Sequence, residues 1–245
     1  MRRIAAGLIV IMSVLLVSCK GKTGNTITVG NDKLDNTQSY FSESMHKAAR
    51  CDSGYYYLDK CGASADNLMF YDDKSEESIV LCNKPQCGHD GEECMAYISG
   101  SEFKSELYYY NSYIYMISSK GNLVQISADG TQRTDLGSIC VLSGQDSVSM
   151  CFNDGYAYVS QEITGDIEGN VTVRLYRFNL DTGSSDKIYE ETGYGIGINS
   201  LKTYGSDTFF LKTSVSKDDK GLYSLEGKGI FRIAGEDIEC LLDKN

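Results

Sequence analysis

The run Asn153-Asp154-Gly155-Tyr156-Ala157-Tyr158-Val159 places a polar turn directly before a segment in which every second residue is aromatic. Asn, Asp and Gly favour turns because they tolerate unusual backbone conformations, whereas aromatic and β-branched residues favour half-buried strands. Related turn-and-strand units begin near residues 52, 111 and 205. The sequence therefore predicts a repeated β unit, and outside the first 18 residues no window sustains a helical apolar period.

Each unit is predicted to hold four strands. The second strands are predicted at residues 55–58, 113–117, 156–159 and 208–211, the third at 68–71, 123–126, 175–178 and 230–233, and the fourth at 79–81, 134–136, 187–189 and 238–241. Successive units are 59, 42 and 52 residues apart, and propeller blades run to about 40–50 residues. We therefore expect an all-β, β-propeller-like domain over residues 45–245, with four four-stranded blades in a closed or incomplete ring. A β-sandwich is the competing fold.

Two segments interrupt the repeat. The first unit contains a cysteine-rich loop at residues 82–94, and the last contains a polar, Gly-rich stretch at residues 214–229, which we expect to be an excursion from the sheet.

The first 18 residues have the composition of an export signal. Met1-Arg2-Arg3 precedes a largely apolar run of 14 residues, which is shorter than the roughly 20 residues of a spanning helix. Leu16-Val17-Ser18-Cys19 follows and resembles a bacterial lipobox. The resemblance implies a cleaved signal helix (1–18), lipid on Cys19 and a stable anchor on the extracytoplasmic face of a cell membrane. The alternatives are an ordinary signal peptide and a short N-terminal helix. Residues 19–44 are polar and predict a flexible tether.

The charge excludes several partners. The net charge is -11, and loss of residues 1–18 would leave 21 basic and 34 acidic groups. Such an acidic protein repels nucleic acid and anionic lipid. We therefore predict no nucleic-acid partner and no polybasic membrane contact.

Eight cysteines follow Cys19, at positions 51, 61, 82, 87, 94, 140, 151 and 240. An even number in an exported protein indicates disulfides, and eight cysteines allow 105 connectivities. Cys51 and Cys61 flank one predicted hairpin, which makes them a candidate pair. Cys140 and Cys151 flank the passage from the second unit to the third.

Cys82, Cys87, His89 and Cys94 form the denser pattern Cys-x4-Cys-x-His-x4-Cys. Three thiolates and one imidazole are the ligand set of a tetrahedral structural zinc site. Disulfides are the first interpretation and zinc is a close second, because an exported loop can oxidise before it meets metal. In both cases we expect this loop to clip the first blade to its neighbour.

The Tyr-rich second strands, the third strands and the run Leu81-Cys82-Asn83-Lys84-Pro85-Gln86-Cys87-Gly88-His89 together resemble a family of exported lipoproteins of anaerobic gut bacteria. Members of that family are predicted TolB-like propellers of unknown function. The resemblance covers residues 19–245 and implies a short or truncated member, because similar proteins generally carry more blades. It brings no established reaction with it.

Motifs for catalysis are missing from the sequence. The two histidines are His46 and His89, and there is no Gly-x-Ser-x-Gly elbow, His-Glu-x-x-His pair, phosphate loop or dinucleotide fingerprint. The main prediction is a non-enzymatic binding or scaffold protein for a protein, peptide or glycan ligand. The alternatives are an exported hydrolase or lyase that uses acidic residues, and a metal- or redox-responsive lipoprotein that uses the cysteine loop.

Overall fold

The computed structural model describes residues 48–104, 106–165, 169–235 and 237–243. The predicted signal helix (1–18), lipidated Cys19, the tether (19–44) and His46 lie outside the described residues. All the regular secondary structure in the described part consists of β-strands. No helix capable of crossing a membrane occurs there.

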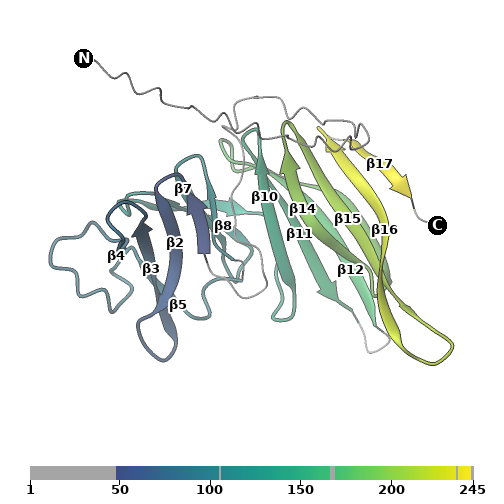
Figure 1. Cartoon of the computed structure of the whole chain (residues 1–245), viewed down its shortest axis with the longest axis horizontal. Helices are drawn as coiled ribbons and strands as arrows, with labels where there is room; N and C mark the ends of the chain where they lie inside the picture. Colours follow the sequence, from purple (N-terminus) through teal and green to yellow (C-terminus); the bar gives the residue numbers. More distant parts are fainter. Residues whose placement is uncertain (1–47, 105, 166–168, 236, 244–245) are drawn as a thin grey trace, which may run out of the picture. The chain divides into compact units, whose positions relative to one another are not determined.

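The strands form four antiparallel sheets in which consecutive strands pair, except that β5 pairs with β3 (Figure 1). Blade one contains β1 (Ala48–Cys51), β2 (Gly54–Lys60), β3 (Ala65–Asp72), β4 (Glu77–Val80) and β5 (Tyr97–Ser99). Blade two contains β6 (Tyr108–Tyr110), β7 (Tyr113–Ile117), β8 (Asn122–Ser127) and β9 (Arg133–Ser138). Blade three contains β10 (Ser147–Asn153), β11 (Tyr156–Thr164), β12 (Asn170–Asn179) and β13 (Ser185–Tyr194). Blade four contains β14 (Gly197–Tyr204), β15 (Asp207–Lys217), β16 (Tyr223–Ala234) and β17 (Asp237–Asp243). The predicted all-β fold with four propeller-like blades is confirmed.

The predicted turns set the register of the first hairpin in blades two and three. Asn111 and Ser112 have φ of 47° and 66°, and Asp154 and Gly155 have φ of 46° and 78°. Two consecutive positive φ values match the two-residue turn whose twist suits a β-hairpin. Tyr110 consequently pairs with Tyr113, and Asn153 pairs with Tyr156.

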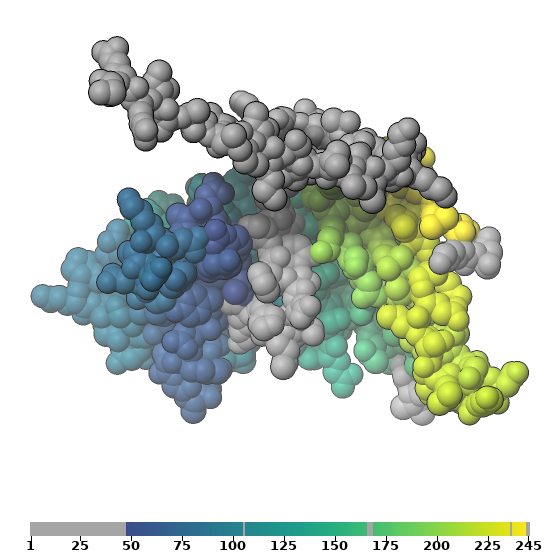
Figure 2. Space-filling view, viewed as in Figure 1, coloured from purple at the N-terminus to yellow at the C-terminus, as the bar shows by residue number. Residues whose placement is uncertain are grey.

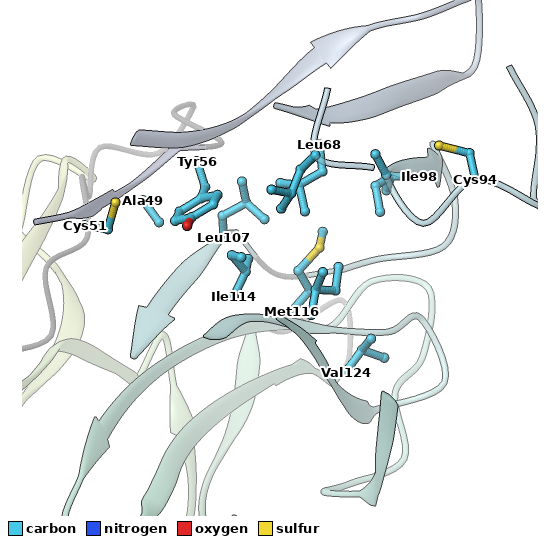
Figure 3. Close-up of a cluster of buried hydrophobic side chains, with 13 residues drawn as sticks. Ala49, Cys51, Tyr56, Leu68, Cys94, Ile98, Leu107, Ile114, Met116 and Val124 are labelled. Atoms are coloured by element: carbon cyan, nitrogen blue, oxygen red, sulfur yellow. The ribbon is translucent and has the colours of Figure 1, made fainter. Parts of the chain in front are cut away.

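Three buried clusters join consecutive blades. Cluster one packs Tyr56 and Leu68 of blade one with Ile114 and Met116 of blade two (Figure 3). Cluster two joins blades two and three, and cluster three joins blades three and four. Burial of each large apolar side chain contributes about 1.5–3 kcal/mol. Within the described residues, no cluster of this kind joins blade four to blade one.

Two parts of the prediction were wrong. Residues 214–229 belong largely to the long hairpin of β15 and β16, whose tip extends beyond the neighbouring strands (Figure 2). Ser216 pairs with Ser224 there, so a strand forms although both faces are polar. Blade one also has a fifth strand, β5, which follows the cysteine loop and pairs with β3.

Candidate metal centre

The cysteine loop leaves and rejoins one edge of β3. Val80 of β4 pairs with Met69, and Tyr97 of β5 pairs with Asn67 on the same edge. Leu68, between these two positions, accepts a hydrogen bond from Leu81 N (2.9 Å) and donates one to Ala96 O (2.8 Å). Both ends of the loop are therefore held by the sheet, and the chain between them must fold back on itself.

Two tight turns shape the inside of the loop. Cys87 N donates to Lys84 O (3.3 Å), and Cys94 N donates to Gly91 O (2.9 Å). Lys84 Nζ donates to Glu93 O at 2.9 Å and links the two turns. Gln86 and His89 adopt left-handed conformations, with φ of 58° and 57°. A non-Gly residue in that region costs on the order of 1–3 kcal/mol and persists only where surrounding interactions impose it.

These turns bring the four predicted ligands together. The Sγ atoms of Cys82, Cys87 and Cys94 and a ring nitrogen of His89 all lie within 4.8 Å of one another. Bonds of about 2.3 Å to sulfur and 2.0 Å to nitrogen would put the ligand atoms of a tetrahedral zinc roughly 3.5–3.8 Å apart. The longest separation in the cluster therefore has to shorten by about 1.0–1.3 Å for the four residues to bind an ion. These four residues form a group that can bind a metal.

The protein environment shifts the pKa of two of the thiols in opposite directions. Burial raises the pKa of the Cys94 thiol to about 11. Burial also acts upward on Cys82, but hydrogen bonds from the backbone of Lys84 and Met95 and from the Cys94 and Cys87 thiols lower its pKa overall. The Cys82 thiol therefore loses its proton more readily than the Cys94 thiol does. A divalent cation beside these thiols would favour the thiolate form of each.

The loop also encloses a hollow of about 420 Å³ that is lined by Cys87, His89 and Cys94. Cys94 is buried, whereas the other three ligands are partly exposed. Cys94 at the same time belongs to cluster one, near Ile98 (Figure 3). An ion would thus enter from the solvent side, and its binding would fix a residue of the core between blades one and two.

The eight described cysteines are free thiols. The candidate pair Cys51 and Cys61 is wrong, because Cys51 lies opposite Gly54 at the start of β2 and Cys61 follows its far end. Cys140 packs in cluster two and Cys151 in cluster three, so they contact opposite faces of blade three. Among the described cysteines, only those of the loop gather into a group that could hold a metal ion.

A second hollow of about 780 Å³ lies between blades one and two and contains acids and an arginine that the sequence did not single out. Arg133 forms an ion pair with Glu102 and donates to Tyr97 O at 3.2 Å. Asp135 accepts from Asn122 Nδ2 (2.7 Å) and Gly137 N (2.9 Å). The contacts of Arg133 link blade two to blade one and to the segment that follows β5, whereas those of Asp135 stay within blade two. His89, the one histidine among the described residues, lies in the thiol cluster instead.

No family model matches the chain. No curated protein matches it. Among solved structures, the chain is similar to an oligogalacturonate lyase in complex with manganese, with 11% identity and a TM-score of 0.41 over 73% of this chain and 42% of that one. An oligogalacturonate lyase from Vibrio parahaemolyticus has 10% identity and a TM-score of 0.41 over 86% of this chain and 66% of that one. The chain thus spans less than two thirds of either structure, and similarity this distant carries no functional assignment.

Proposed function

We propose that this protein is a lipid-anchored, extracytoplasmic binding scaffold of propeller-type blades, in which a structural zinc ion holds the cysteine loop of blade one. The convergence of Cys82, Cys87, His89 and Cys94 within 4.8 Å supports this proposal. A site with four protein ligands leaves no coordination position for a substrate, which is typical of structural rather than catalytic zinc.

The proposed ion would stabilise the loop where the sheet does not. Strand pairing fixes the ends at Val80 and Tyr97, but Gln86 and His89 hold unfavourable conformations between them. Metal–ligand bonds would offset that conformational cost. Because Cys94 also packs in cluster one, they would fasten the loop to the junction of blades one and two.

A direct test is zinc analysis together with thiol counting on protein purified without reductant. We expect one zinc per chain and no disulfide within the loop. Cys87→Ser should lose the zinc, and Cys240→Ser, which changes an exposed cysteine of β17, should retain it. A zinc-free protein whose loop cysteines are paired would reject the zinc centre and support oxidation of the loop.

The membrane location rests on the lipobox that ends at Cys19. As part of the same proposal, the chain is a member of the exported propeller lipoproteins. Its ligand would be a protein, peptide or glycan that binds at the blade loops. Mass spectrometry of the mature amino terminus should find a diacylglyceryl group on Cys19. An unmodified chain that still begins at Met1 would remove the anchor from the proposal.

A second candidate function is that of an exported hydrolase or lyase, and the hollow between blades one and two is the observation that favours it. Glu92, Glu102, Asp135 and Arg133 all line that hollow. The mutual pairing of Arg133 with Glu102 makes a linking role the better explanation. The enzyme would become the better candidate if the protein cleaved an acidic oligosaccharide and if both Glu92→Gln and Asp135→Asn abolished the cleavage without a change in thermal stability.

A redox-responsive role would gain support if mild oxidant removed the free thiols of the cysteine loop and reduction restored them.

A further inference from the structure

Blade four presents one sheet face that no described blade covers. We define the blade-four end face by Phe209, Leu211, Ile230, Arg232 and Leu242. Register places Leu211 beside Ile230 and Ile230 beside Leu242, while Phe209 lies beside Arg232. Ile230 and Leu242 are 40% and 49% exposed. The alternate residues of the same strands, Phe210 and Ile233, are buried against blade three.

The blade-four end face repeats the pattern of a face that is covered elsewhere in the molecule. In blade three, Tyr158 lies beside Arg177 as Phe209 lies beside Arg232. Both arginines face an acid on the next strand, at 3.6 Å for Arg177–Asp186 and 2.6 Å for Arg232–Glu239. The blade-three face packs against blade four in cluster three.

Contacts at the covered junctions show how such a face engages the blade that follows it. Arg177 Nη1 donates to Gly235 O at 3.0 Å, in the turn between the third and fourth strands of blade four. Tyr56 OH donates to Ala128 O at 3.0 Å, where the third strand of blade two has just ended. Blades one and three thus reach the same turn of the blade that follows them, and the surface that fits the blade-four end face is the leading face of another blade.

Blade one carries a leading face of that kind. We define the blade-one end face by Tyr55, Tyr57, Met69 and Tyr71. Tyr55 pairs with Tyr71 and Tyr57 with Met69, whereas Tyr56, on the opposite face, packs in cluster one. In blades two and three the corresponding leading residues, Ile114 and Ala157, are buried against the preceding blade. None of the four residues of the blade-one end face belongs to a cluster.

We propose that two copies of the chain associate head to tail, with the blade-four end face of each copy packed on the blade-one end face of the other. A second copy covers both end faces at once and continues the junction that the chain already makes three times. Two junctions would close a ring of eight blades, within the range of about four to eight seen in propellers.

The test is the mass of the full-length chain in detergent, by sedimentation velocity and native mass spectrometry. Wild type should have the mass of two copies. Leu242→Glu, on the blade-four end face, and Tyr57→Glu, on the blade-one end face, should each be monomeric, with the dissociation constant raised at least about tenfold because a charge would be buried without a partner. Lys220→Glu, in the exposed tip of the β15–β16 hairpin, is the matched control and should remain a dimer.

Mixing the two interface variants makes the test specific for head-to-tail contact. Leu242→Glu retains an intact blade-one end face and Tyr57→Glu retains an intact blade-four end face, so an equimolar mixture should form a dimer through one junction. Circular dichroism and thermal unfolding first establish that both variants fold; if Tyr57→Glu does not, Tyr71→Glu replaces it on the same face. A monomeric wild type at micromolar concentration would overturn the proposal, as would interface variants that remain dimeric or a mixture that stays monomeric. The first two results would point to another segment of the chain or another partner on these faces.

Discussion

His89 Nδ1 lies 3.3 Å from Cys94 Sγ, although the two residues are five positions apart in a polar loop. The contact depends on the left-handed conformation of His89 and on the turn that closes from Gly91 to Cys94. A tetrahedral metal site requires the convergence of four ligands such as this ring nitrogen and three thiols. Here the convergence includes a residue, His89, in an unfavourable backbone conformation.

Removal of the metal should lower the stability of the wild type and leave the stability of Cys87→Ser, which lacks one metal ligand, unchanged. Chelation of the protein should lower its Tm by several degrees, because the metal–ligand bonds that support the loop would be lost. Cys87→Ser should unfold near the Tm of the chelated wild type and should not respond to the chelator. Differential scanning calorimetry with and without chelator measures both effects. An equal response of wild type and Cys87→Ser would place the chelator-sensitive ion elsewhere.

Gly121 should be far less replaceable than another glycine with similar backbone angles. Gly121 has a φ of +86°, and a Cβ there would lie 1.9 Å from Cys140 O. Gly205 has a φ of +60°, and nothing lies within 4 Å of a Cβ at its position. Gly205→Ala should cost about 1–2 kcal/mol from backbone conformation alone, whereas Gly121→Ala should cost at least about 3 kcal/mol because the β7–β8 turn must also move. Urea unfolding at pH 7 measures the difference, and equal costs would show that the turn yields freely.

The junction between blades one and two should be sensitive to loss of a single side chain. Ile114 is 0% exposed in cluster one, whereas Ile79 of β4 is 57% exposed. Ile114→Ala should lower the free energy of unfolding by about 2–5 kcal/mol, because it removes buried contacts and leaves a cavity. Ile79→Ala should change it by less than about 0.5 kcal/mol. Similar losses at both positions would contradict the packing described for cluster one.

Asp146 should make the protein less stable in acid. Burial acts to raise the pKa of its carboxyl, but hydrogen bonds from the Ser143 hydroxyl and N–H and from the Gln161 amide lower it below the ordinary value. A lowered pKa in the folded state means that the carboxylate stabilises the fold above about pH 4, and that this contribution is lost as pH falls through the folded-state pKa. Asp146→Asn should therefore be less stable than wild type at pH 7, and the difference should shrink toward pH 3. Urea titrations across that range measure it, with Asp219→Asn in an exposed turn as control; a gap that does not change with pH would contradict the assignment.

The strand repeat was predictable because turn residues and aromatic alternation are local signals. The four predicted second strands lie within β2, β7, β11 and β15. β5 was missed because its three residues pair with a strand about 30 positions earlier and carry no alternation of their own. The outer part of the β15–β16 hairpin was missed because it has no buried face to impose an apolar pattern. In both cases a partner strand, rather than the local sequence, determines the structure.

The candidate site was predictable in composition but not in chemistry. Spacing alone identified Cys82, Cys87, His89 and Cys94, but the sequence ranked disulfides above zinc because an exported loop can oxidise before it meets metal. Three features favour a metal: the distances among the four ligand atoms, the φ of His89, and the hydrogen bonds by which Leu68 holds both ends of the loop. They become visible only in the folded structure, where β4 and β5 share an edge of β3. The end faces of blades one and four likewise emerge only from strand register.

X-ray absorption at the zinc edge, on protein purified without reductant or added metal, tests the central claim most directly. The account predicts a first shell of three sulfurs at about 2.3 Å and one nitrogen at about 2.0 Å, and the sulfur count should fall to two in any Cys87→Ser protein that still holds zinc. A shell of oxygen and nitrogen only, or protein that contains no zinc at all, would contradict it.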